Sequence, residues 1–196
     1  MLKMQLLRKS CFNEGGVMEF VKFNKIPRLS RGCVITEKID GTNASIYIGE
    51  DGEFLTGSRK RWITPEDDNY GFSRWANENK DELMKLGEGW HYGEWWGQGI
   101  QRKYNMDKKV FSLFNTGRWK DNPDLPKCCR HTPVLFEGMF DTANIEQAIE
   151  DLKQNGSMAS PGFMKPEGIV IFQKAGQNLF KKTIEKDEAH KYEILA

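Results

Sequence analysis

Short apolar runs separated by turn residues dominate the pattern of this 196-residue chain. Most runs alternate apolar and polar positions or are rich in β-branched residues, and Gly, Pro and Asn bound them, which is typical of β-strands. We expect strands over residues 33–39, 44–48, 53–56, 90–95, 109–115, 134–139, 168–172 and 178–183. Residues 71–85 and 144–155 carry apolar side chains at helical spacing instead. The pattern predicts an α+β domain of mainly antiparallel sheets flanked by a few helices.

The length and composition fit a single domain that covers residues 1–196. A chain of this size can bury a sizeable core, and no repeat, low-complexity tract or linker divides it. The 29 Lys and Arg residues against 28 Asp and Glu give a net charge of +1, which neither favours nor excludes a nucleic-acid partner. Basic runs at 59–61, 101–103 and 181–182 suit a charged cleft and ordinary solvated faces equally well.

Cysteine usage and hydropathy indicate a reduced, cytoplasmic protein without a membrane partner. The four cysteines show no regular spacing, and no apolar stretch resembles a signal peptide or is long enough to span a membrane. Cys128 and Cys129 lie close to His131, but no Cys-x-x-Cys pair accompanies them, so zinc is not expected.

The clearest chemistry lies in residues 37–43, Glu-Lys-Ile-Asp-Gly-Thr-Asn, at the end of the first predicted strand. An amine in a buried site among other cations loses its proton more readily than an amine in water, so Lys38 can attack phosphorus. Gly41 lets the backbone approach a nucleotide, and Thr42 and Asn43 offer donors and acceptors to it. A strand that leads into an exposed turn gives the same pattern, so this motif alone does not decide the function.

Residues 38–41, Lys-Ile-Asp-Gly, resemble motif I of the covalent nucleotidyltransferases, which include ATP-dependent DNA ligases, RNA ligases and messenger-RNA capping enzymes. Further segments resemble later motifs of the same superfamily in the expected order: residues 57–60 motif Ia, 92–94 motif III, 109–115 motif IIIa, 167–171 motif IV and 179–183 motif V. Six ordered elements are hard to obtain by chance. The resemblance implies a nucleotidyltransferase domain, similar to the ATP-grasp architecture.

The resemblance also implies roles for individual residues. Lys38 would attack the α-phosphorus of ATP, and the other catalytic residues would be Asp40, Glu94, Glu167 and Lys181. Glu94 and Glu167 would also hold Mg²⁺ or Mn²⁺ together with phosphates and water. The residues that would bind the nucleotide are Glu37, Ile39, Asn43, Arg59, Phe114, Lys181 and Lys182.

Some of these assignments are more specific. Glu37 would accept a hydrogen bond from the adenine amino group, and Phe114 would stack on the adenine. Asn115 follows Phe114 where the family commonly has aspartate. Glu137 is a second candidate for the motif IV glutamate. Of the two adjacent lysines we favour Lys181 for the α-phosphate, because strand alternation places Lys182 on the opposite face with Phe180.

Thr42 and Asn43 after the glycine are similar to the RNA ligase 2 class, whereas DNA ligases and capping enzymes carry an arginine in this region. We therefore predict an ATP-dependent RNA ligase, phage-encoded or bacterial, that joins 3′-hydroxyl and 5′-phosphate ends through a lysyl-AMP intermediate. Its substrates would be RNA ends or a nicked duplex. Only residues 185–196 follow motif V, so we expect no appended OB or RNA-binding domain, and an accessory protein could supply an RNA-binding surface.

Two alternatives remain open at this point. One is a DNA ligase or a capping-type enzyme. The other is a nucleic-acid-binding module without ligase activity, in which tryptophans among basic residues act as stacking surfaces rather than as core residues. The tryptophans concerned are Trp62, Trp75, Trp95, Trp96 and Trp119.

Overall fold

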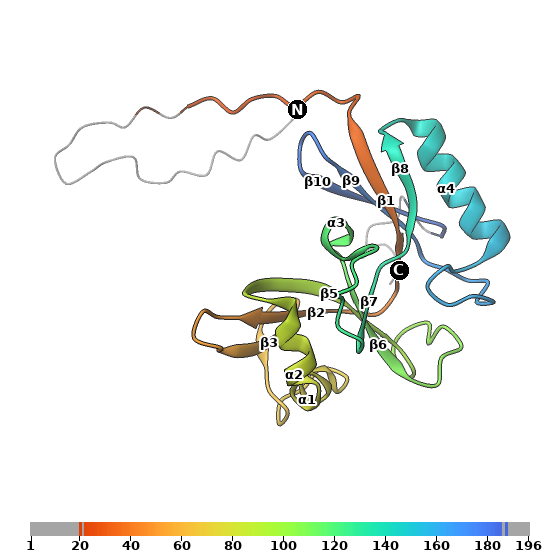
Figure 1. Ribbon diagram of the computed structural model, residues 1–196. Helices are drawn as coiled ribbons and strands as arrows, with labels where there is room; N and C mark the ends of the chain where they lie inside the picture. The colour runs from red at the N-terminus through yellow and green to blue at the C-terminus, as the bar shows by residue number, and fades with distance from the viewer. Residues whose placement is uncertain (1–19, 21, 186, 188–196) are drawn as a thin grey trace, which may run out of the picture.

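Two β-sheets form the body of the protein in a computed structural model, which describes residue 20, residues 22–185 and residue 187 (Figure 1). The four-stranded sheet has the strand order β10-β9-β1-β8, and the six-stranded sheet has the order β4-β3-β2-β5-β6-β7. Neighbouring strands are antiparallel, except that β6 and β7 are parallel. The predicted α+β fold with mainly antiparallel sheets is confirmed.

The strands are β1 (Gly32–Lys38), β2 (Thr42–Ile48), β3 (Phe54–Ser58), β4 (Trp62–Ile63), β5 (Gly89–Gly97), β6 (Lys109–Leu113), β7 (Cys129–His131), β8 (Val134–Met139), β9 (Gly168–Gln173) and β10 (Asn178–Thr183). The helices are α1 (Phe72–Glu78), α2 (Lys80–Leu83), the 3-10 helix η1 (Met84–Leu86), α3 (Thr116–Trp119) and α4 (Thr142–Asn155). All eight predicted strands are present. The short elements β4, β7 and α3 were not predicted, because two to four residues are too few to show a period.

Two predicted boundaries are wrong because an asparagine ends the element. The helix predicted over 71–85 is divided into α1, α2 and η1, and the break lies at Asn79, whose side-chain amide donates to the Trp75 carbonyl at 2.8 Å. The strand predicted to reach Asn115 ends at Leu113, and the Asn115 side chain accepts from the Arg118 N–H at the start of α3. Asparagine side chains compete in this way with regular backbone hydrogen bonding.

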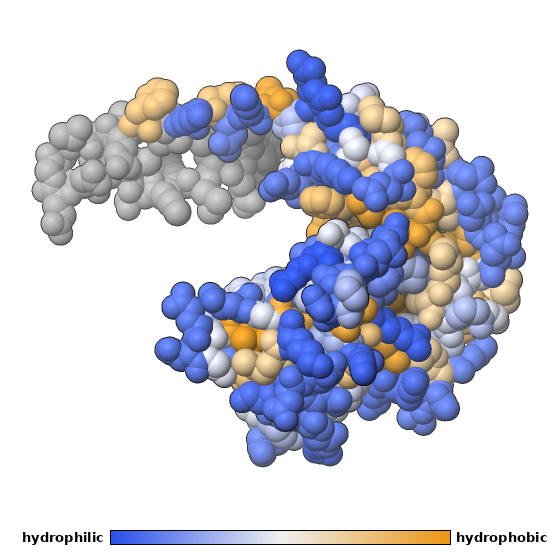
Figure 2. Space-filling model, in the orientation of Figure 1, coloured by the Kyte–Doolittle hydropathy of each residue, from blue (hydrophilic) through white to orange (hydrophobic). Residues whose placement is uncertain are grey.

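Each sheet packs its own helices against one face. In the four-stranded sheet, Cys33, Ile35, Ile169 and Ile171 bury against α4. In the six-stranded sheet, residues such as Ile46, Trp95 and Phe111 form a core with the α1 and α2 region. A third cluster joins the two sheets and contains Ile39, Trp96, Tyr104, Val110, Ala159 and Phe163. The two remaining sheet faces border a common recess, which is visible in the space-filling view (Figure 2).

Strand alternation directs the side chains of β1 in turn toward α4 and toward the recess. Cys33, Ile35 and Glu37 are buried on the side of α4, whereas Thr36 and Lys38 lie on the recess side. The recess between the sheets therefore receives the amine of the first sequence motif. Among the residues that the structure describes, no helix has the length and apolar character needed to cross a membrane.

The N-terminus of α4 provides a test of this packing. Asp141 caps the helix, and its carboxylate accepts from the Asn144 N–H at 2.8 Å. We expect Asp141→Ala to lower the free energy of unfolding by about 1 kcal/mol, because it leaves a helix N–H without this acceptor. Urea denaturation followed by circular dichroism measures the change, with Asp141→Asn as the variant that retains a cap. Equal stability of wild type and Asp141→Ala would contradict the assignment.

Candidate active site

The chain crosses from the four-stranded to the six-stranded sheet between β1 and β2, and Gly41 lies in this crossing. A Cβ at Gly41 would lie 2.5 Å from the Trp95 carbonyl oxygen and 2.7 Å from the Trp96 Cβ. Such distances are too short for any side chain, so the packing requires glycine. The Gly41 N–H donates to Glu94 Oε1 at 3.1 Å. The crossing is therefore held against β5 by close packing and by a hydrogen bond.

Lys38 stands at the end of β1 and contacts a carboxylate directly. Its ammonium donates to Glu167 Oε2 at 2.6 Å, and the two side chains are 25% and 18% exposed. Glu167 immediately precedes β9, in which Gly168 pairs with Lys38. A Cβ at Gly168 would lie 2.2 Å from the Lys182 carbonyl oxygen, so this position also requires glycine. Close strand packing thus brings the amine of motif I and the carboxylate of motif IV together.

Glu94 lies on β5 at the same end of the recess and is 8% exposed. Its second oxygen accepts from Asn43 Nδ2 at 2.9 Å, so both carboxylate oxygens are hydrogen-bonded. Burial raises the pKa of Glu94 to about 7, although the positive charge of Lys38 and the two hydrogen bonds act in the opposite direction. This carboxyl group therefore changes its protonation state near neutral pH.

A loop between β5 and β6 fixes the position of Asp40. The Arg102 Nε donates to Asp40 Oδ2 at 3.0 Å, and its Nη1 donates to the Lys165 carbonyl at 3.1 Å. The Asp40 N–H donates to the Tyr104 hydroxyl at 2.8 Å. Residues 101 and 103–105 have φ between +42° and +59°, an unfavourable region for non-glycine residues that surrounding contacts must stabilise.

The clamp on Asp40 was not predicted from the sequence. Arg102 stands out in the sequence only as part of a basic run, and Tyr104 belongs to none of the motifs. Both residues lie more than 60 positions from Asp40. No local pattern marks such a contact, because it depends on how the two sheets meet.

Glu37 lies on the opposite side of β1 from Lys38 and is 1% exposed. Its carboxylate accepts from the Ser157 hydroxyl at 2.6 Å and from the Ala159 N–H at 2.8 Å. Burial raises the pKa of Glu37, and these hydrogen bonds oppose the rise. The carboxylate thus anchors the segment after α4. This placement corrects the expectation that the Glu37 side chain accepts from adenine, because strand alternation directs it away from the face that carries Lys38.

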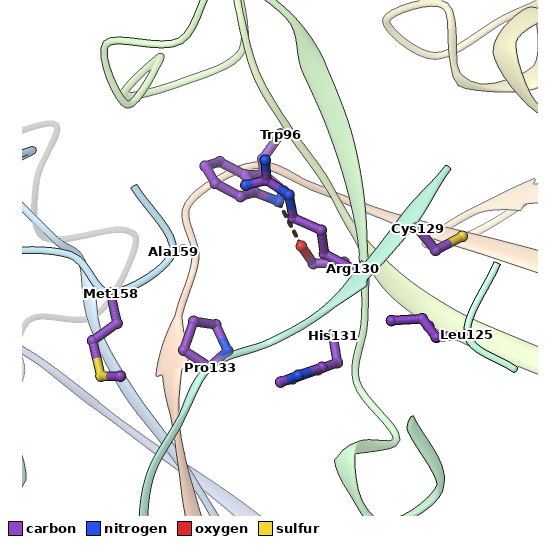
Figure 3. A pocket seen from close by; sticks show the side chains of 9 residues that line it. Trp96, Leu125, Cys129, Arg130, His131, Pro133, Met158 and Ala159 are labelled. Carbon is purple, nitrogen blue, oxygen red and sulfur yellow. Dashed lines mark hydrogen bonds between the residues drawn. The ribbon is translucent and has the colours of Figure 1, made fainter. Parts of the chain in front are cut away.

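A cavity of about 320 Å³ lies beside β1 and is lined in part by polar residues of the six-stranded sheet, Ser112 and Arg130 (Figure 3). Its lining residues are Trp96, Ser112, Leu125, Cys129, Arg130, His131, Pro133, Met158 and Ala159. Ser112 pairs with Glu94 on one side and with Arg130 on the other. The three residues form one row across the sheet, so the cavity adjoins Glu94. In Figure 3, Trp96 and Arg130 lie on one side of the cavity, and Met158 and Pro133 lie on the other.

Pro133, which lines this cavity, borders the edge of β1. The Glu37 N–H donates to the Pro133 carbonyl at 3.0 Å. In an antiparallel pair the return bond would come from the N–H of the same partner, but proline has no N–H. The Glu37 carbonyl, which points to the same edge as its N–H, therefore receives no ladder hydrogen bond from Pro133.

Other predicted nucleotide-binding residues lie around this region in different ways. Ile39 is 4% exposed and its side chain belongs to the core between the sheets, so only its backbone can contact a ligand. Arg59 is exposed and directly follows Ser58, which pairs with Ala44 beside Asn43. Phe114 is 43% exposed just after β6 and does not line the cavity.

The two adjacent lysines of β10 face opposite sides of the four-stranded sheet. Lys182 Nζ lies 3.4 Å from Glu146 Oε1 of α4 and 3.6 Å from Asp187 Oδ2. Lys181 pairs with Val170, which in turn pairs with Thr36 on the recess side of β1. The alternation predicted for this strand is therefore present, and Lys181 is the lysine on the same face as Lys38.

The two candidates for the motif IV glutamate are also separated by the structure. Glu137 lies opposite Val34 in β8 and is paired with Lys174 at 2.6 Å. Glu167 contacts Lys38, as described above. Of the two candidates, Glu167 is therefore the one beside the motif I lysine, and its assignment to motif IV stays a prediction.

Glu94 and Glu167 give the site a limited capacity to hold a metal ion. Within the described part of the chain, no group of three or more His, Cys, Asp or Glu side chains could hold one. Carboxylate oxygens suit Mg²⁺ and Mn²⁺, but two carboxylates leave most of an octahedral shell to other oxygen ligands. The residues fit an ion that is held mainly by phosphates and water, and they do not fit a metal held by protein ligands alone.

Comparisons with known proteins show the family and the fold of this chain. A family model described as RNA ligase matches residues 31–183. A search of curated proteins finds no match. Among solved structures, a mutant RNA ligase of Naegleria gruberi with ATP and Mn is similar, with a TM-score of 0.62 and 22% sequence identity over 83% of this chain and 53% of the other. A second mutant of that ligase, with AMP and Mn, has a TM-score of 0.61 and 20% identity over 79% and 50%.

At such identities these structural similarities show a shared fold. The chain spans about half the length of the solved chains that it matches.

The buried state of Glu94 leads to a prediction for stability. Its pKa is raised from the ordinary value of 4.5 to about 7, so the folded protein binds the proton more tightly than the unfolded chain does. Glu94 therefore destabilises the fold increasingly as the pH rises from about 4.5 to about 7, by roughly 3 kcal/mol in total. We expect the stability of Glu94→Gln relative to wild type to increase over this range.

Urea denaturation of both proteins at a series of pH values measures this difference. Glu37, whose pKa is also raised, is present in both proteins and cancels in the comparison. A difference that does not vary with pH would refute the assignment of the titration to Glu94.

Proposed function

Because the chain belongs to the RNA ligase family, we propose that it is an ATP-dependent RNA ligase that forms a covalent lysyl-AMP intermediate on Lys38. The observation that carries the proposal is the placement of the Lys38 amine at the junction of the two sheets, 2.6 Å from Glu167 and under the electrostatic influence of Glu94. A solvated lysine in an exposed turn would lack both the ion pair with Glu167 and the electrostatic interaction with Glu94. The finer assignment to the RNA ligase 2 class rests on Thr42 and Asn43.

In the first step, Lys38 Nζ attacks the α-phosphorus of ATP. A bond forms between nitrogen and phosphorus, the bond from phosphorus to the bridging oxygen breaks, and pyrophosphate leaves. The amine must lose protons to attack, and Glu167 is the carboxylate in contact with it. A bound Mg²⁺ or Mn²⁺ would offset the negative charge of the phosphates. Lys181 lies on the same sheet face and would contribute a further positive charge at the α-phosphate.

The cavity beside β1 is the proposed adenine site. Its mixed apolar and polar walls are of the kind that enclose small ligands. We assign the acceptor for the adenine amino group to the Glu37 carbonyl instead of the Glu37 carboxylate, and the Ile39 N–H to a neighbouring ring nitrogen. Both groups belong to the backbone, so this readout of ATP would survive side-chain substitution at either position. The predicted stacking of Phe114 on the base is not part of this placement, because Phe114 does not line the cavity.

The later steps transfer the adenylate to RNA. AMP passes from Lys38 to a 5′-phosphate, and a 3′-hydroxyl then displaces AMP and closes the phosphodiester bond. Arg102 and Tyr104 hold Asp40 in place. We therefore assign Asp40 a role in positioning the end of β1 during all three transfers. An accessory protein that supplies additional RNA-binding surface is compatible with this proposal.

Removal of the nucleophile is the primary test. We expect Lys38→Ala to abolish the covalent AMP adduct that wild type forms with α-labelled ATP and magnesium, measured on a denaturing gel. Lys153→Ala, which removes an exposed lysine of α4, serves as the control and should form the adduct normally. An adduct on Lys38→Ala would refute the assignment of the nucleophile.

The same assay separates the alternative functions. Labelling by GTP in preference to ATP would indicate a capping-type enzyme, and sealing of nicked DNA in preference to RNA would indicate a DNA ligase. Absence of any adduct with wild type would favour a binding module.

The two lysines of β10 provide a matched pair of variants. We expect Lys181→Ala to slow adduct formation by about 100-fold, because it removes a positive charge from the face that carries Lys38. Lys182→Ala should slow it less than about threefold, because that side chain pairs with Glu146 and Asp187 on the α4 side. Single-turnover labelling measures both rates. The reverse order of effects would assign the phosphate contact to Lys182.

A further inference from the structure

A strip of aromatic side chains lies on the recess face of the six-stranded sheet, apart from the residues assigned to adenylate transfer. The aromatic strip consists of Trp62, Trp90 and Tyr92, which are 48%, 49% and 54% exposed. The Trp62 and Trp90 ring centroids are 5.1 Å apart with an interplanar angle of 18°, and those of Trp90 and Tyr92 are 5.6 Å apart with an angle of 2°. The three rings are therefore arranged in a nearly parallel series.

The strip is aligned with the candidate active site. Trp90, Tyr92 and Glu94 occupy alternate positions of β5 and therefore project from the same face of the sheet. With a rise of about 3.3 Å per residue, Tyr92 begins roughly 7 Å and Trp90 roughly 13 Å from Glu94 along the strand. A strand of nucleic acid that reaches Lys38 along β5 would pass these rings.

Most of the other tryptophans are buried, in contrast to the two in the strip. Trp95, Trp96 and Trp119 are at most 2% exposed. Trp62 comes from β4 and reaches Trp90 of β5 across the intervening strands, where small side chains leave room for it. A Cβ at Gly57 would lie 2.7 Å from Ser45 Oγ and 3.5 Å from the Trp62 ring. Small residues beneath the strip thus allow Trp62 to pack against Trp90.

Positive charge accompanies the strip at its outer end. Arg59 and Lys60 are exposed in the turn between β3 and β4, just before Trp62, and form no ion pair within the described residues. The neighbouring Arg61 is instead paired with Asp67. Aromatic faces with adjacent free cations bind single-stranded nucleic acids, because unpaired bases stack on the rings while phosphates meet the cations. A surface that docks an apolar protein segment does not require these cations.

We propose that the aromatic strip binds unpaired nucleotides of the strand that is being joined, with bases packed against the outer faces and exposed edges of the three rings and phosphates near Arg59 and Lys60. The identification of that strand as RNA rests on the proposed function. Bases within a duplex are already stacked on one another and are not available to these rings. The strip therefore favours an RNA end with unpaired nucleotides over a fully paired one.

The test compares binding and adenylation in the same variants. Fluorescence anisotropy measures the affinity of the full chain, without ATP, for a labelled single-stranded RNA 12-mer and for a blunt RNA hairpin with the same number of nucleotides. The strip variants are Trp90→Leu and Tyr92→Leu, and Tyr92→Phe keeps an aromatic ring. The control is Tyr70→Ala, because Tyr70 is also about half exposed, and its carbonyl accepts from Trp95, which belongs to the core on the other face.

We expect Trp90→Leu and Tyr92→Leu to weaken binding of the single strand about tenfold each and to change binding of the hairpin less than twofold. Tyr92→Phe and Tyr70→Ala should bind the single strand like wild type. Unchanged affinity in both leucine variants would overturn the proposal, and so would an equal loss in Tyr70→Ala.

Adduct formation with labelled ATP separates this proposal from the proposed function. Trp90→Leu should still form lysyl-AMP within about twofold of wild type, because Trp90 lies outside the motif III segment 92–94 and forms no hydrogen bond or ion pair with Lys38 or Glu167 among the described residues. If wild type forms no adduct but the leucine variants still lose RNA binding, the proposed function fails and the strip remains a nucleic-acid site.

A measurement on wild type keeps the proposal falsifiable if a leucine variant does not fold. A single-stranded RNA that carries 5-iodouridine is crosslinked by ultraviolet light, and the modified peptides are identified by mass spectrometry. Crosslinks at Trp62, Trp90 or Tyr92 support the strip, and crosslinks confined to other residues overturn it.

Discussion

The close contact between Gly41 and β5 is the constraint on which the rest of this structure depends. The chain leaves one sheet and enters the other within residues 39–41, and the crossing has room only for a residue without a Cβ. The Gly41 N–H binds Glu94, and the neighbouring Asp40 is held by Arg102 and Tyr104. Because Lys38 is the last residue before this crossing, the same contacts that join the sheets also determine where its amine lies.

Strand alternation then determines on which face of its sheet each of the other motif residues lies. On β1 and β10 it directs Lys38 and Lys181 into the recess, and it directs Glu37 and Lys182 to the side of α4, where they bind the loop after the helix and the helix itself. Catalytic and structural residues can therefore be adjacent in sequence without competing for the same space. The polar character of a motif residue does not by itself indicate that it faces the substrate.

This distinction explains how far the sequence predicts the molecule. The strands follow from local apolar patterns, and their ends were predicted to within two residues. The contact of Lys38 with Glu167 was also within reach, because motif order and antiparallel pairing bring the two together. The Glu37 side chain lies away from its expected place beside the nucleotide, because strand alternation puts it on the side of β1 opposite Lys38. The clamp on Asp40 and the aromatic strip arise from contacts between distant segments, which no local pattern records.

Pro133 shows how a residue without reactive groups can shape the chemistry of the site. It accepts a hydrogen bond from Glu37 but cannot return one, so the β1 and β8 ladder stops where the cavity begins. A residue with an N–H at this position would be able to pair with the Glu37 carbonyl, to which Pro133 cannot donate. The selectivity that we assign to the backbone of β1 thus depends on a missing N–H donor just before the neighbouring strand β8. Gly41, Gly57 and Gly168 act in a similar way, because the absence of a side chain at each position allows neighbouring segments to approach closely.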